Sequence, residues 1–279
     1  YFISLLLLGI PLMWIEWTLG RYGGGFGHGT APGIFHSLWQ KNRFIKYFGV
    51  IGIFGPLVIF IYYVFIESWT LAYSFFALTG KYTALLDQSS LRSFLIGFQG
   101  LEKNQYFDGI FTAYVFFLIA FISNIWVIYY GIKGGIEKLC NLALPILFVF
   151  GFALIVRVLT LGTPDLNRPD WNVMAGLGFL WNPDFSALKS AKVWLEASGQ
   201  ILFTLSVGIG VILTYASYLK KADDVVLSGL TAATTNEIAE VILGGSIIIP
   251  AAFVFFGPVD IKSIAQSGVF NLGFVTMPL

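Results

Sequence analysis

Residues 203–210 read FTLSVGIG and lie inside a long apolar stretch, where one continuous membrane-spanning helix would be expected. Thr204 and Ser206 bring hydroxyl groups to this stretch, and Gly208 and Gly210 weaken a helix. In hydrocarbon, backbone groups freed by a break must find partners. Freed carbonyls suit a small cation, and the start of the following half-helix suits an anion. The stretch therefore predicts a break in the helix, and one such break can hold both a sodium ion and a carboxylate.

Polar residues elsewhere follow helical spacing. Residues four apart lie on one face of a helix, so a polar stripe forms wherever such spacing recurs. Such stripes must face one another or a water-filled cavity, because hydrocarbon offers them no partner. Three segments present one: Ile59, Tyr63 and Glu67; Glu196, Gln200 and Thr204; and Asn236 with Glu240.

Carboxylates near a bilayer centre are costly, at roughly 2.5–3.5 kcal/mol each on insertion scales. Five candidates occur in apolar segments, and two explanations compete for them. They serve a binding site, or they hydrogen-bond the helices to one another. Both remain open for Glu16, Glu67 and Glu237, whereas the break beside Thr204 and Ser206 favours a site. The five are Glu16, Glu67, Glu196, Glu237 and Glu240.

The elements that position these residues follow from composition. The chain is 57% hydrophobic, 18% aromatic and 11% charged, which indicates an all-α membrane protein. Six segments reach the roughly 20 residues that a spanning helix needs. We expect one transmembrane domain, 1–279, with an external loop at 257–279. The expected spans are 1–22, 46–78, 109–130, 138–160, 191–218 with its break near 204–210, and 227–256.

Basic residues predict the orientation. Lys and Arg are dense in the short connections 21–46, 131–138 and 218–226. Short cytoplasmic loops carry an excess of these residues, so we expect all three connections to lie in the cytoplasm. Tyr1 then begins outside the membrane.

Other classes of function find little support. A net charge of +1 with no basic run indicates no nucleic-acid partner, and one cysteine matches no metal-ligand spacing. The loop GGGFGHG lacks the Lys-Ser/Thr of a phosphate-binding loop, and we assign its histidines, His28 and His36, no role. No catalytic motif of a hydrolase or metalloprotease occurs, so we do not expect an enzyme.

Four blocks carry a resemblance: IPLMWIEWTLGRYGG at 10–24, IYYVFIESW at 61–69, GQILFTLSVGIG at 199–210 and SGLTAATTNEIAEVILGGS at 228–246. They resemble the neurotransmitter:sodium symporter family, in its bacterial leucine-transporter-like branch. The resemblance implies a bundle of about twelve spans with inverted repeats, whose discontinuous helices meet at a midplane site. The chain looks like a piece covering spans 2 to 7, with span 6 discontinuous and spans 1 and 8 absent. The second sodium site would lie on those two spans.

The resemblance also implies roles for individual residues. Sodium, the only cofactor implied, would be bound by Thr204 and Asn236. Tyr1, Gln200 and Glu240 match the surround of the chloride site in animal members, where a Ser stands in place of Glu240. The fixed carboxylate therefore predicts chloride-independent transport. The substrate-binding residues would be Ile59, Tyr63, Phe203, Thr204, Ser206 and Ile209.

Two positions depart from the leucine-transporter pattern, since Ile209 replaces a Phe and Ile59 replaces a Val. The preferred amino acid therefore stays open. The implied function is sodium-coupled symport of an amino acid by alternating access. An amino-acid-binding receptor without transport and a channel are the alternatives. The implied partners are the substrate, sodium ions and the lipid bilayer of a prokaryotic inner membrane, and a homodimer is a possible assembly.

Overall fold

The computed structural model describes residues 1–85, 87–164, 166–266, 270 and 272–278, and all regular structure in them is helical. The chain divides into two compact units, residues 1–61 with 183–240 and residues 62–182 with 241–279. The first unit contains α1 (Phe2–Ser4), η1 (Leu5–Gly9), α2 (Ile10–Gly24), α3 (Ala31–Leu38), α4 (Ile45–Phe48), η3 (Phe185–Lys189), α10 (Ala191–Thr204), α11 (Val211–Ala216) and α12 (Val225–Glu237). The second contains α6 (Gln88–Phe98), α7 (Phe111–Tyr129), η2 (Ile132–Ile136), α8 (Glu137–Leu159), α9 (Val173–Trp181), α13 (Gly245–Gln266) and η5 (Leu272–Thr276). Helices α5 (Ile51–Thr79) and η4 (Ile238–Gly244) pass from one unit into the other.

Five helical runs of the described residues are long and apolar enough to cross a membrane. They begin and end within a few residues of five of the expected spans. The expected segment 191–218 is not among these runs, because it is interrupted near 204–210 as predicted: α10 and α11 are separate helices, and each is shorter than a bilayer requires. The five runs are Phe2–Gly24, Ile45–Thr79, Phe111–Tyr129, Ile132–Leu159 and Val225–Pro258.

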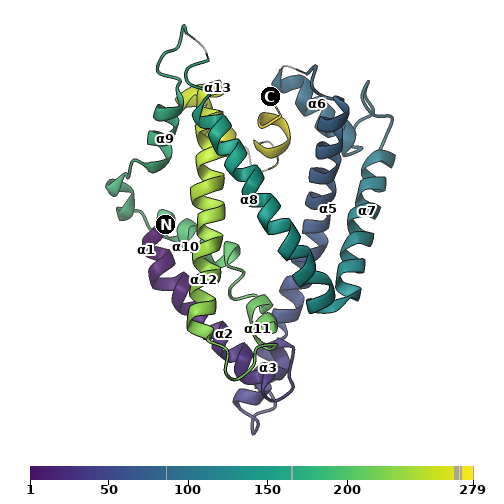
Figure 1. Ribbon diagram of the computed structural model, residues 1–279, viewed down its shortest axis with the longest axis vertical. Helices are drawn as coiled ribbons and strands as arrows, with labels where there is room; N and C mark the ends of the chain where they lie inside the picture. The colour runs from purple at the N-terminus through teal and green to yellow at the C-terminus, as the bar shows by residue number, and fades with distance from the viewer. Residues whose placement is uncertain (86, 165, 267–269, 271, 279) are drawn as a thin grey trace. The chain divides into compact units, whose positions relative to one another are not determined.

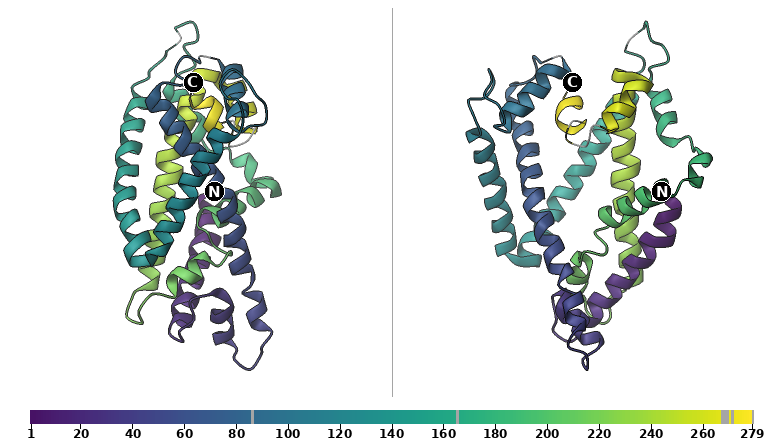
Figure 2. Two further views of the ribbon diagram at one scale, coloured as in Figure 1. Left: turned by 90° about the vertical axis from the view of Figure 1, so that its right-hand side faces the viewer. Right: turned by 180° about the vertical axis from the view of Figure 1, so that it is seen from behind.

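The first unit is organised around α2, which packs against α11 and α12 (Figures 1 and 2). Its largest apolar cluster joins Leu5 and Met13 to residues on both sides of the helix break, among them Ile201 and Val207. Arg21 Nη1 donates a hydrogen bond of 2.5 Å to the carbonyl oxygen of Asp223. This bond brings together two connections that the basic residues predict on the same side of the membrane.

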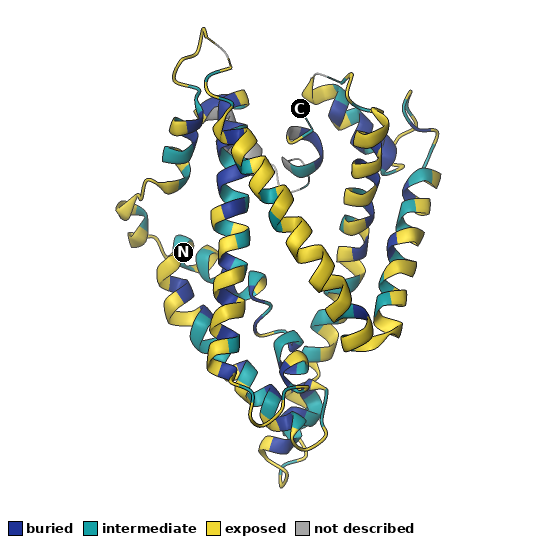
Figure 3. Ribbon diagram, viewed as in Figure 1, coloured by how far each residue is buried: buried dark blue, intermediate teal, exposed yellow. Residues whose placement is uncertain are grey.

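The second unit is held by aromatic packing. Tyr73 and Phe76 of α5, Phe94 and Phe98 of α6 and Phe274 of η5 share one buried cluster. Helix α9 packs on α13, and η2 joins α7 to α8 as a short turn (Figure 1). Most of α8 is exposed along its length (Figure 3), as a helix in contact with lipid would be.

The expected connections contain helices of their own. The glycine-rich connection after α2 includes α3 and α4, and the long stretch 79–108 includes α6, whose N-cap is Asp87. In the expected external loop 257–279, residues 267–269, 271 and 279 lie outside the described residues. The described part is helical on either side of Gly257, whose φ of 75° interrupts α13. The sequence did not predict the helices in these connections, because short helices leave only a weak periodic signal.

Candidate functional site

The break in the fifth predicted segment begins where α10 ends. The backbone N–H of Val207 donates to the Leu202 carbonyl, at 3.0 Å, and that of Ser206 donates to the Phe203 carbonyl, at 3.1 Å. This pair of bonds is a Schellman motif, which usually has glycine at the left-handed position. Here Ser206 occupies it with a φ of 54°, the only positive φ of a non-glycine residue in the described chain. The helix end is thus satisfied internally, at the cost of backbone strain at a predicted substrate residue.

The second half of the break depends on glycine. Gly208 and Gly210 have φ values of 85° and 83°, and α11 begins directly after Gly210. Gly210 also lies against the backbone of Gly52 on α5, so that a Cβ at either residue would overlap the other chain segment. Glycines therefore permit both the reversal of the chain and its close approach to α5.

Four predicted residues meet at the first half of the break. Gln200 Nε2 donates to Glu240 Oε1 at 2.7 Å, and the Thr204 hydroxyl donates to Glu240 Oε2. Asn236 Nδ2 donates to Thr204 Oγ1 at 2.7 Å and approaches Glu240 Oε2 at 3.5 Å. We call Gln200, Thr204, Asn236 and Glu240 the polar network. It lies within the first unit, between α10 and the junction of α12 with η4.

The polar network suits a hard cation by its donor chemistry. Sodium prefers oxygen ligands, as other hard cations do, and the network offers a hydroxyl, an amide and a carboxylate. Because Asn236 donates through its amide nitrogen, these bonds leave its amide oxygen to serve as a ligand. Clusters of three or more His, Cys, Asp and Glu, which would indicate a transition metal, do not occur among the described residues.

Of the remaining predicted substrate residues, Ile209 is the best placed in the structure. Its side chain faces Gly55 of α5, where a Cβ would lie 3.6 Å from that of Ile209. Ile59 follows Gly55 by one helical turn and shares its face, so α5 presents Ile59 on the side of the break. Phe203 is 52% exposed at the end of α10.

Tyr63 and Glu67 continue the stripe of Ile59 on α5, as the spacing predicts, because α5 is one helix through all three residues. Both lie in the second unit. Tyr63 is 44% exposed, and Glu67 Oε2 accepts a bond of 2.5 Å from Asn124 of α7. Glu67 thus joins two helices, which is the bundling role that the sequence had left open.

Two other predicted residues form contacts outside the polar network. Tyr1, expected around Glu240, donates its hydroxyl to Glu237 Oε1 at 3.2 Å, and Glu237 is a buried carboxylate of α12. Glu196 shares one face of α10 with Gln200 and Thr204, as the spacing predicts, because α10 is one helix through all three residues. Its side chain is exposed. It forms an ion pair of 3.7 Å with Lys192.

Sequence reasoning left one residue of the site undecided. Glu16 of α2 is 8% exposed, and its Oε1 accepts a bond of 2.6 Å from the backbone N–H of Gly208. Its Oε2 has no hydrogen-bond partner among the described residues. A carboxylate in the apolar run IPLMWIEWTLG was the available signal. Its partner is a backbone amide, which has no sequence signature, so only the fold connects it to the break.

The sequence model of the sodium:neurotransmitter symporter family matches residues 98–278, well over half of the chain. The chain belongs to this family. Two prokaryotic proteins are similar to it, and both are described as uncharacterized sodium-dependent transporters. That of Methanocaldococcus jannaschii is 30% identical over all of this chain and 53% of its own length. That of Haemophilus influenzae is 27% identical over 91% of this chain and 52% of its own length.

A solved structure of the family has the same fold. The crystal structure of MhsT in complex with L-phenylalanine has a TM-score of 0.79 and 30% sequence identity, covering all of this chain and 56% of that one. The chain therefore spans about half the length of the relatives it matches. The family, the all-α transporter fold and the multi-pass location in a prokaryotic cell membrane, all expected from the sequence, are confirmed.

Proposed function

We propose that the protein containing this chain is a sodium-coupled symporter that carries an amino acid by alternating access. The observation that supports this most directly is the polar network at the end of α10. A broken helix beside convergent oxygen ligands is the arrangement in which secondary transporters of this fold class hold substrate and ion together. Family membership and the sodium-dependent relatives support the same proposal.

Within the network we assign the sodium ion to Thr204 and Asn236. Sodium would supply positive charge beside the substrate carboxylate. Glu240, in contact with both residues, contributes a negative charge that is covalently fixed. At this range and in a medium of low dielectric, that attraction is large. An exchangeable chloride is then unnecessary, so we propose chloride-independent transport.

For the substrate we propose an amino acid bound by Ile59, Tyr63, Phe203, Thr204, Ser206 and Ile209. Ile209 packs against the face of α5 that carries Gly55 and Ile59. This packing supports an apolar wall of the substrate site that Ile59 and Ile209 share. MhsT, which has the same fold over the whole of this chain, was crystallised with L-phenylalanine, and this supports an amino acid as the substrate. Ile59 and Ile209 would set the size of the side chain accepted.

The test is uptake of labelled amino acids into proteoliposomes that contain the complete protein. We expect uptake that depends on an inward sodium gradient, saturates with substrate and is lost when potassium replaces sodium. Equal uptake in sodium and in potassium would refute sodium-coupled symport. Binding without uptake would indicate a receptor, and flux that does not saturate would indicate a channel.

A further inference from the structure

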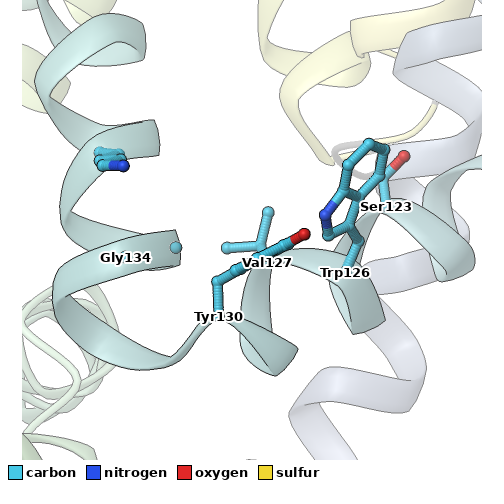
Figure 4. A pocket seen from close by; sticks show the side chains of 7 residues that line it. Ser123, Trp126, Val127, Tyr130 and Gly134 are labelled. Atoms are coloured by element: carbon cyan, nitrogen blue, oxygen red, sulfur yellow. The ribbon is translucent and has the colours of Figure 1, made fainter.

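A pocket with a different chemistry lies in the second unit, at the turn that joins α7 to α8 (Figure 4). Its volume is about 390 Å³. Two transmembrane helices and the turn between them supply its walls. They include Ser123, Trp126 and Tyr130 from α7 and its C-cap, Gly134 and Gly135 from η2, and Lys138 from α8.

The turn places this pocket at a membrane boundary. Helix α7 ends at Tyr129 and the next spanning run begins at Ile132, so both spans meet the aqueous phase here. In their most apolar stretches, only 6% of Phe111–Tyr129 and 11% of Ile132–Leu159 is buried. Figure 3 shows the exposed length of α8. The basic residues predict that the turn is cytoplasmic. Acyl chains can therefore lie against both helices directly beside the pocket.

The lining combines the groups that recognise an anionic headgroup. Trp126 and Tyr130 are 63% and 57% exposed, and their ring centroids lie 6.4 Å apart. Such aromatic residues are enriched at the headgroup level of membranes. Lys138 adds an ammonium group, and Ser123 adds a hydroxyl. Gly135 lies so close to the Val127 carbonyl that any side chain there would overlap it, which keeps the turn tight and the pocket free of a side chain at that position.

We propose that this pocket binds the phosphodiester headgroup of an anionic phospholipid, with Lys138 beside the phosphate and the acyl chains along α7 and α8. The pocket lies at the small end of the roughly 300–1,000 Å³ range of ligand sites, which suits a headgroup and excludes a whole lipid. The turn carries Lys133 and Lys138 beside one acidic residue, Glu137, so its net charge is +1, which complements one phosphate. Basic pockets between cytoplasmic helix ends bind such headgroups. This site is independent of the transport proposal.

The test uses tryptophan quenching of the complete protein in nanodiscs, which requires no transport. Brominated phosphatidylglycerol and brominated phosphatidylcholine are compared as quenchers. We expect stronger quenching by phosphatidylglycerol, and Trp126→Phe should remove that excess. Lys138→Gln should reduce the preference for phosphatidylglycerol about fivefold, the equivalent of about 1 kcal/mol for one basic residue near an anionic surface. Lys133→Gln is the matched control, because Lys133 lies in the same turn outside the pocket lining.

Each result decides the proposal. Equal quenching by the two lipids overturns it, and so does an excess of quenching by phosphatidylglycerol that persists in Trp126→Phe. It is also overturned if Lys133→Gln lowers the preference for phosphatidylglycerol as much as Lys138→Gln does. Inorganic phosphate added to phosphatidylcholine nanodiscs separates the lipid from a free anion. If phosphate there protects Trp126 from a soluble quencher and phosphatidylglycerol does not, the pocket binds a free anion and the lipid proposal fails. If another part of the complete protein covers the pocket, Trp126 will not be quenched by either lipid, which also contradicts it.

Discussion

Asn236 donates a hydrogen bond of 2.7 Å to the hydroxyl of Thr204, across 32 positions of sequence and between two helices. The hydroxyl in turn donates to Glu240, so the three side chains form a directional chain that ends on a negative charge. This chain lies at the end of α10, where the backbone leaves the helix. The proposed sodium ion would therefore contact side chains that are already joined to one another.

Removing either oxygen ligand should weaken sodium binding. For Thr204→Val and Asn236→Ala we expect the sodium concentration for half-maximal uptake to rise about tenfold to a hundredfold, because hydrogen bonds and contacts to charged groups contribute about 1.5–3 kcal/mol. The measurement is sodium-dependent uptake by the complete protein in proteoliposomes. Thr231→Val, an exposed position on the same helix α12, is the control and should leave the sodium dependence unchanged. An unchanged sodium dependence in both site variants would remove these residues from the sodium site.

The carboxylate of Glu240 should determine the requirement for chloride. In Glu240→Ser the fixed negative charge is lost, while a hydroxyl remains near Gln200 and Thr204, which contact the native carboxylate. We expect uptake by this variant to be stimulated by chloride and uptake by the unchanged protein to be indifferent to it. Comparing uptake in chloride and in gluconate checks this. If the variant is equally active in both anions, Glu240 does not replace chloride.

Glu16 should hold the break in shape through Gly208. Glu16→Leu leaves the Gly208 N–H without its acceptor in hydrocarbon, which costs several kcal/mol. Glu16→Gln keeps an acceptor oxygen but loses the charge that strengthens the bond. We therefore expect the midpoint of thermal unfolding in detergent to fall slightly for Gln and strongly for Leu. Glu196→Gln, at an exposed ion pair, is the control and should have little effect. A Leu variant as stable as the Gln variant would argue against this role.

The approach of Gly210 to Gly52 should tolerate no side chain. Gly210→Ala meets the Gly52 backbone and also places a Cβ at a φ of 83°, where left-handed backbone costs roughly 1–2 kcal/mol for other residues. We expect a clear loss of thermal stability. Gly199→Ala is the matched control, because its Cβ would meet nothing within 4 Å. In helix α10 that change should stabilise by up to about 1 kcal/mol. Equal effects of the two variants would contradict the packing described for Gly210.

Helix α6, outside the membrane spans, should lose its N-cap in acid. The Ser89 hydroxyl, with the Ser90 amide and hydroxyl, donates to Asp87 and lowers the pKa of that carboxyl below its ordinary value of 3.8. The cap therefore stabilises α6 above the ordinary pKa, and this contribution is lost as the pH falls through the lowered value. Hydrogen exchange at the start of α6 should accelerate in that range. Asp87→Asn, which caps without a charge, should abolish the pH dependence.

Much of the fold could be predicted from the sequence. Apolar length alone located five spanning helices, since a bilayer demands about 20 apolar residues whatever the neighbours are. The break near 204–210 was also readable, because glycines and hydroxyls inside an apolar run are costly unless they serve a site. The short helices α3, α4 and α6 were missed, because their sequences carry no long periodic pattern.

The pairing of side chains was decided by tertiary structure. Helical spacing placed Gln200 with Thr204 and Asn236 with Glu240, and only the packing of α10 on α12 and η4 joined these pairs. Glu196 shares the same face of α10, as the spacing predicts, and its exposed carboxylate pairs there with Lys192. Tyr1 pairs with Glu237, and Glu16 bonds to a backbone amide that no sequence motif marks. The sequence alone determined which faces are polar, because periodicity is a local property of one helix. Which faces meet depends on contacts between distant segments, and these exist only in the folded chain.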